Sequence, residues 1–226
     1  MSTTGAGTTS RRISVATGGT IAWFVLMVVL GRAGTFASPA GTPPVAVGLA
    51  AALPPVGALA LLGLSHRFRG WGRTRDLHLL TTLQAWRTGG LAFLALAAVG
   101  ALPLEFALPA GLGDVLVGIT APIVATLLAR GALGAPAYLA WTAFGVVDLV
   151  LAVTLGVLYS DRTADPIPGE VTTRLMSELP MSIVPTFFVP FLLTVHVLAL
   201  AALHASHGPG NRARHEPGAR TATLSG

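Results

Sequence analysis

Five polar side chains lie inside otherwise apolar stretches of this 226-residue sequence: Gln84, Arg87, Asp114, Asp148 and His196. A charged group costs about 2.5–3.5 kcal/mol at the centre of a membrane helix, so such residues are expected to face the interior of a helical bundle and to pair there. An arginine, two acids and a histidine brought together in this way can bind a proton, an ion or a small molecule.

The depth of each residue along its helix predicts which of them meet. At about 1.5 Å per residue, Arg87 lies about 12 Å from the cytoplasmic end of its helix, Asp148 about 18 Å, His196 about 10 Å and Asp114 near 22 Å. We therefore predict an Arg87–Asp148 pair with His196 nearby, and place Asp114 in the outer half of the bundle. Gln84, three residues before Arg87, shares its helix face and completes the predicted cluster.

Each of these residues also has a structural interpretation. Arg87 can extend along its own stem to the cytoplasmic surface, and an Arg87–Asp148 pair can serve stability alone. His196 can be a neutral side chain that donates to a backbone carbonyl, and Asp114 can cap a helix that begins near Pro109. The sequence leaves both sets of interpretations open.

The helices that must position these residues are evident from composition. Hydrophobic residues make up 53% of the chain and charged residues 10%, whereas soluble domains contain about 25% charged residues. A membrane-spanning helix needs about 20 predominantly apolar residues. Six stretches approach or exceed this length: Ile13–Leu30, Pro43–Ser65, Leu79–Pro103, Pro109–Ala129, Pro136–Tyr159 and Met181–Leu203. The predicted fold is an all-α, polytopic bundle of six transmembrane helices.

The arginines predict the orientation of this bundle. All 14 basic residues are arginine, and with the N-terminus inside, ten of them fall in cytoplasmic segments, against Arg32, Arg162 and Arg174 outside. Such an excess is typical of cytoplasmic loops, so both termini are predicted in the cytoplasm. The net charge of +5 follows this pattern, and the partner that it indicates is a lipid bilayer rather than nucleic acid.

Three domains are predicted on this basis. Residues 1–12 and 206–226 are rich in Gly, Ser, Thr, Pro and charge, so they are predicted to be disordered cytoplasmic tails. Residues 13–205 form the bundle. The Ser10-Arg11-Arg12 start before an apolar run also fits a cleaved export signal, which is the alternative to a retained first helix.

Two segments of the chain resemble each other. Residues Phe36–Ala51 (FASPAGTPPVAVGLAA) and Phe106–Ala121 (FALPAGLGDVLVGITA) match at nine of sixteen positions. We predict that each opens a helix running inward, within a two-helix unit used twice in parallel. The alternative is that helices rich in small residues resemble one another by composition. Asp114 replaces Pro44 of the first copy.

Several catalytic classes lack their signatures here. Cysteine is absent, which excludes disulfides, thiolate metal sites and cysteine nucleophiles. Phosphate-loop, dinucleotide, zinc-protease and nucleophile-elbow motifs are absent from useful positions. Haem held between two helices requires a pair of facing histidines, and His196 is the only histidine that lies deep within a predicted span. We therefore expect no cofactor and no metal site, and an enzyme is the least favoured class.

Short motifs suggest a family. Gln84-x-x-Arg87-x-x-Gly90, the segment Phe106–Asp114 (FALPAGLGD), Gly145-x-x-Asp148-Leu149 and Val189-Pro190-Phe191-x-x-x-x-His196 resemble an uncharacterised family of small bacterial six-helix integral membrane proteins. The resemblance covers about residues 80–200. It implies a multi-pass protein of the bacterial inner membrane and no particular activity.

Buried charges, helices interrupted by proline and a repeat favour small-molecule or proton-linked transport or binding. The second hypothesis is a structural or accessory membrane subunit, because six helices make a small transporter unless the chain forms a homo-oligomer. The surroundings of the polar cluster discriminate between them. A cavity beside the cluster favours transport, whereas a dry, fully paired network favours a structural role.

Overall fold

The computed structural model describes residues 4–39, 41–160 and 171–206, and within these ranges the chain is helical without a β-strand, which confirms the all-α prediction. The elements in chain order are α1 (Thr4–Arg32), α2 (Val45–Leu64), α3 (His66–Arg73), α4 (Leu77–Thr82), η1 (Leu83–Gly90), α5 (Leu91–Ala98), α6 (Leu104–Ala129), α7 (Ala135–Leu158), η2 (Thr173–Ser177), η3 (Val184–Phe188) and α8 (Val189–Ser206). Of the predicted C-terminal tail, residues 206–226, Ser206 is the last residue of α8 and residues 207–226 lie outside the described ranges.

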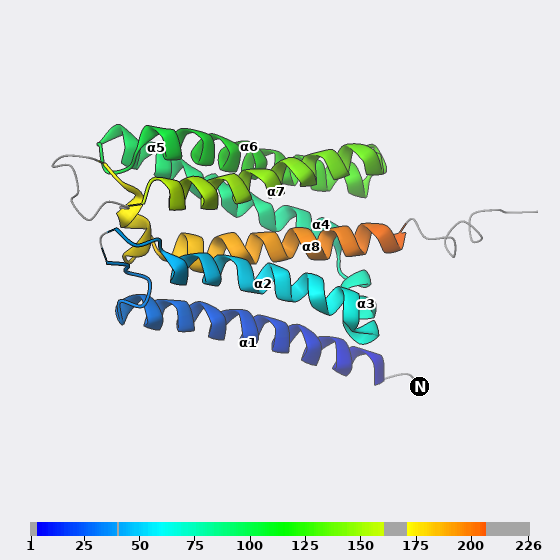
Figure 1. Cartoon of the computed structure of the whole chain (residues 1–226). Helices are drawn as coiled ribbons and strands as arrows, with labels where there is room; N and C mark the ends of the chain where they lie inside the picture. The colour runs from blue at the N-terminus through cyan, green and yellow to red at the C-terminus, as the bar shows by residue number, and fades with distance from the viewer. Residues whose placement is uncertain (1–3, 40, 161–170, 207–226) are drawn as a thin grey trace, which may run out of the picture.

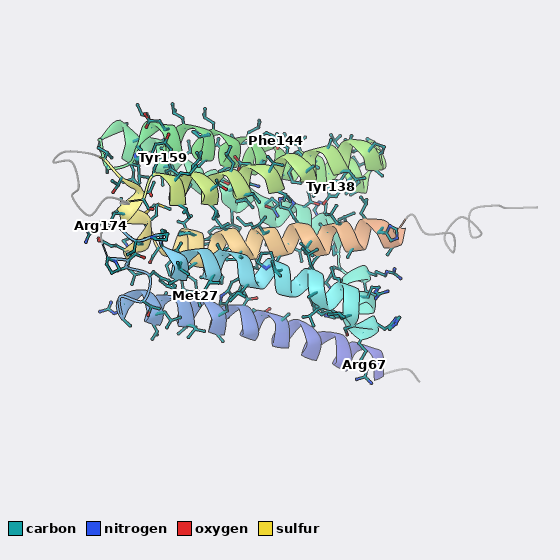
Figure 2. All side chains as sticks on the ribbon, viewed as in Figure 1. Met27, Arg67, Tyr138, Phe144, Tyr159 and Arg174 are labelled. Atoms are coloured by element: carbon teal, nitrogen blue, oxygen red, sulfur yellow. The ribbon has the colours of Figure 1, made fainter. Side chains whose placement is uncertain are left out.

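The long helices lie side by side and cross the bundle in alternating directions (Figure 1). Because α4, η1 and α5 follow one another without a gap, they form a single rod from Leu77 to Ala98. The beginning of α1 and the end of α8 lie at the same end of the bundle, together with α3 (Figure 1). Arg67 lies at this end and Arg174 at the opposite end (Figure 2).

Four helices are long and apolar enough to cross a membrane: Val45–Leu64, Leu104–Ala129, Ala135–Leu158 and Val184–Ala205. The other two predicted spans look different in the structure. Within α1 (Thr4–Arg32), the residues whose side chains the structure describes form a shorter apolar helical segment, Ala16–Arg32. The rod from Leu77 to Ala98 is divided by the 3₁₀ helix η1. Length and composition therefore support four spans of the predicted six.

Helix α6 begins at Leu104 rather than at the predicted Pro109. Pro103 occupies the N-cap position, and its carbonyl accepts hydrogen bonds from Phe106 N (3.2 Å) and Ala107 N (2.9 Å). The segment predicted as a loop, Leu104–Leu108, is therefore the first turn of the helix. Pro109 lies inside it rather than at its start.

The two copies of the sequence repeat differ in local structure. In the first copy, residues 36–39 and 41–44 are non-helical and Gly41 has a φ of 78°, whereas the second copy lies entirely within α6. Pro43 and Pro44 account for the difference, because a proline disfavours helical backbone in the residue before it. The two Phe-Ala-x-Pro-Ala-Gly segments therefore differ in local structure, although the helices that follow or contain them, α2 and α6, run in the same direction (Figure 1).

Helices η3 and α8 follow one another without a gap and form the last rod, from Val184 to Ser206, which contains an irregular segment. Residues Val184–Phe188 form a π-helical turn, in which Val189 N donates to Val184 O. Pro185 lies within this turn and Pro190 lies two residues after it, and both lack the N–H group that a regular α-helix would use. Short π-helical turns of this kind interrupt α-helices frequently at functional sites.

The described part of the long loop before this rod covers one end of the bundle. Thr173 Oγ1 donates to the carbonyl of Gly156 (2.5 Å), and Met176 packs into a cluster that contains Phe93 and Phe106. Helix η2 is therefore fixed to α7 and the core beneath it.

Candidate functional site

The side chain of Arg87 joins three rods at the centre of the bundle. Its Nε donates to Asp114 Oδ1 (2.7 Å) on α6, and its Nη1 donates to the carbonyl of Gly145 (2.9 Å) on α7. Its Nη2 donates to Asp148, also on α7. The exposed fraction of the Arg87 side chain is 0%. A fully buried guanidinium thus has a partner for each of its nitrogens.

The 3₁₀ helix η1 aligns Arg87 with the other buried residues of its rod. A 3₁₀ helix has three residues per turn, so side chains three positions apart share one face. Residues at this spacing are all buried: Thr81, Gln84, Arg87, Gly90 and Phe93. Hydrogen-bonding side chains and a glycine thus form a single stripe that faces α6, α7 and α8.

Glycines allow the neighbouring helices to approach this stripe. A Cβ on Gly118 of α6 would lie 2.5 Å from Thr88 N, and a Cβ on Gly145 of α7 would lie 2.8 Å from His196 Nε2 and 3.1 Å from Arg87 Nη1. A larger residue at either position would push η1 or α8 away. Close packing at these points is therefore a condition for burying Arg87.

The structure contains the Arg87–Asp148 pair that the depths predict, and it adds Asp114 to that pair. The predicted separation of Asp114 is wrong for two reasons. The rod begins at Leu77 instead of the predicted Leu79, and the 3₁₀ helix η1 rises about 2.0 Å per residue instead of 1.5 Å, so Arg87 lies about 17 Å from Leu77. Arg87 is therefore deep enough to reach both acids.

His196 and Gln84 lie at the side of the cluster that faces α8. The buried imidazole of His196 packs edge-on against Trp141, with 6.0 Å between ring centroids. Gln84 shares the buried face of Arg87, and its Nε2 donates to the carbonyl of Leu192 (3.2 Å), so Gln84 links η1 to α8. Within the described part of the chain, His196 Nε2 and Gln84 Oε1 are buried without a hydrogen-bond partner.

The ion-pair cluster has an excess of negative charge. Arg87 carries one positive charge, and Asp114 and Asp148 carry two negative charges when both are ionised. An uncompensated charge is costly in a low-dielectric interior. The arrangement is therefore suited to hold one additional proton or one cation beside Arg87.

A cavity of about 270 Å³ borders the cluster between the η1–α5 segment and the η3–α8 rod. Arg87 and Asp114 lie in its wall among apolar residues that include Trp86, Phe188 and Leu192. Asp114 also borders a smaller cavity, of about 50 Å³, next to Pro44. Asp114 is therefore the acid that adjoins open space, while Asp148 lines neither cavity.

Two polar contacts in this region involve groups that are absent from the predicted cluster. The carbonyl of Gly145 carries no side-chain signal, although Gly145 belongs to the motif that ends in Asp148. The hydroxyl groups of Thr81 and Tyr138 lie 2.9 Å apart and are buried. Thr81 was detectable from its spacing, because it precedes Gln84 by the same three residues that separate Gln84 from Arg87.

Removing the central arginine tests the cluster. Arg87→Leu leaves two buried carboxylates without a partner, and we expect it to lower the free energy of unfolding in detergent by about 3–5 kcal/mol. The triple variant Arg87→Leu, Asp114→Asn, Asp148→Asn should recover most of this loss, because the buried charges are gone. The matched control is Arg174→Leu, whose partner Glu178 is exposed and whose loss should cost about 1 kcal/mol or less. Equal losses for Arg87→Leu and the triple variant would contradict the pairing.

Comparison with known proteins places the chain in a family. Residues 44–204 match a family model described as "Domain of unknown function (DUF8737)". No curated protein and no solved structure matches the chain. The matched residues include all five polar residues of the cluster and the helices that carry them. Since the match covers more than half of the sequence, this protein belongs to the DUF8737 family, whose function is unknown.

Proposed function

We propose that this protein is a multi-pass membrane protein that binds a small molecule and couples its binding or transport to a proton held at the Arg87–Asp114–Asp148 cluster. The observation that carries this proposal is one buried guanidinium shared by two carboxylates at the wall of a cavity. Intramembrane ionisable groups of this kind are typical of substrate and proton pathways.

The two acids have different roles in this proposal. Asp148 lies against Gly113 and lines neither cavity, so it is the fixed counterion of Arg87. Asp114 uses Oδ1 to accept from Arg87, and 11% of its side chain is exposed. Asp114 is therefore the group that exchanges its proton with the cavity.

The proposal includes six membrane crossings with both termini in the cytoplasm of a bacterial cell. Support comes from the ends of the bundle, since Arg67, at one end, belongs to a group of arginines on and beside α3, and Arg174 lies at the other (Figure 2). The alternating directions of the rods are also consistent with six crossings (Figure 1). We also propose that the protein forms a homo-oligomer, because six helices are few to enclose a transport pathway.

A structural or accessory subunit is the second candidate function. It is favoured by one observation, the complete set of acceptors around the Arg87 nitrogens. A cluster of this kind can fix helix positions without binding anything. The accessibility of its proton distinguishes the two candidates.

Infrared spectroscopy of the protein in bilayers tests the proton. At neutral pH we expect one protonated-carboxyl C=O band, which shifts in D₂O because Asp114 adjoins the cavity. Asp114→Asn and Asp148→Asn should each abolish it, because the remaining acid then pairs with Arg87 as a carboxylate. The control Glu105→Gln removes an exposed acid from the same helix and should leave the band intact. A missing band would refute the bound proton, and a band that does not exchange would favour the structural role.

Single cysteines test the six crossings, since the chain has no native cysteine. A membrane-impermeant maleimide applied to intact cells should label Thr42→Cys and Ala98→Cys, which lie at exposed positions after α1 and at the end of α5. Ala132→Cys, between α6 and α7, should react only after permeabilisation. Labelling of Ala132→Cys in intact cells would reverse the proposed orientation, and protection of Ala98→Cys would remove the third crossing.

A further inference from the structure

We infer that the cavity of about 270 Å³ beside Arg87 and Asp114 binds a small hydrophobic organic cation that enters from the lipid. This inference rests on the proposed function, because it treats the bundle as embedded in a membrane and the proton of the cluster as exchangeable. It adds the chemical class of the ligand and its route of entry.

The mouth of the cavity lies on the flank of the bundle. Trp86, Gly89 and Ala92 line the cavity and are exposed. They lie near the middle of the rod from Leu77 to Ala98. They are therefore distant from both ends of the bundle. In a membrane this position faces the hydrocarbon region, so a ligand reaches the cavity through the lipid and must itself be largely apolar.

The wall of the cavity suits an apolar ligand with an aromatic or alkyl body. Trp86 at the mouth stacks on Phe188 of η3 with 6.3 Å between ring centroids, and Phe93 and Leu192 lie deeper. Aromatic faces attract organic cations within about 6 Å by about 0.5–2 kcal/mol. The volume is just below the lower limit of about 300 Å³ for pockets that hold drug-sized molecules, so the ligand is small.

The charge beside the cavity selects a cation. The Arg87 nitrogens point at Asp114, Asp148 and the Gly145 carbonyl, so its positive charge is already neutralised. Asp114 Oδ2 accepts no hydrogen bond from any residue that the structure describes, and the second carboxylate gives the cluster its negative excess. A ligand ammonium at Asp114 would balance that excess, whereas an anion would double it.

The proton and the organic cation would compete for the same charge. Either one neutralises the excess carboxylate, and both together would leave a positive excess. Binding of one cation therefore displaces one proton from Asp114, and the total charge of the occupied site does not change. Exchange of this kind is the coupling that the proposed function requires.

Three probes that share a benzyl group and differ in charge test the ligand class on the purified, full-length protein. They are benzyltrimethylammonium, its neutral carbon isostere neopentylbenzene, and phenylacetate. We expect benzyltrimethylammonium to raise the melting temperature saturably, to bind about tenfold or more tightly than the isostere, and to release about one proton per cation into weakly buffered solution. Asp114→Asn should abolish both effects, and Glu105→Gln should change neither.

A second variant separates this inference from the proposed function and does not depend on the folding of Asp114→Asn. Ala92→Phe adds a ring at the exposed mouth and should block benzyltrimethylammonium, while the protonated-carboxyl band remains present because the Arg87–Asp114–Asp148 contacts are untouched. Equal binding of neopentylbenzene would make the cavity a site for lipid chains, and preference for phenylacetate would make it an anion site, so either result overturns the inference. Failure of every probe, with the band present, overturns the inference alone. Absence of the band overturns the proposed function as well.

Discussion

The buried guanidinium of Arg87 is the contact on which the middle of this bundle depends. It holds Asp114 of α6 together with Asp148 and the Gly145 carbonyl of α7, so the relative positions of three rods are linked through one side chain. This contact also requires glycine where the helices approach each other most closely. Without a Cβ at Gly118, the backbone of η1 comes close enough to α6 for Arg87 to reach its partners, and overpacking at such a point typically costs about 1–3 kcal/mol.

The same contact creates an imbalance that a purely structural pair would avoid. A single acid would neutralise Arg87, yet two acids are present, and the second one adjoins a cavity. Buried charges that are incompletely compensated are expensive, and in the proposed function a proton or a ligand compensates the additional carboxylate. The π-helical turn at η3, which contributes Val184 and Phe188 to the cavity wall, places irregular backbone beside this cavity, where membrane proteins tolerate it.

Much of this arrangement can be derived from the sequence, and the parts that cannot have physical reasons. Arg87, Asp114, Asp148 and His196 stand out because charge is costly in an apolar helix, which is a property of each residue alone. The meeting of Asp114 with Arg87 is not predictable from a uniform rise of about 1.5 Å per residue, because the rod from Leu77 to Ala98 contains the 3₁₀ helix η1, which rises about 2.0 Å per residue. The contact of Arg87 with the Gly145 carbonyl is not predictable from side-chain types, because the acceptor is a backbone group. The two repeat segments also differ in local structure, because Pro43 and Pro44 disfavour helical backbone in the first segment, whereas the second lies within α6.

The central claim is that one arginine binds two acids at once. Solid-state NMR of the protein in bilayers measures this directly, through dipolar couplings between the ¹⁵N-labelled guanidinium of Arg87 and the ¹³C-labelled carboxyl carbons, assigned with the Asp114→Asn and Asp148→Asn variants. We expect strong couplings from Nε to the Asp114 carboxyl and from Nη2 to the Asp148 carboxyl in the same sample. A coupling to only one carboxyl carbon, or to neither, would contradict it.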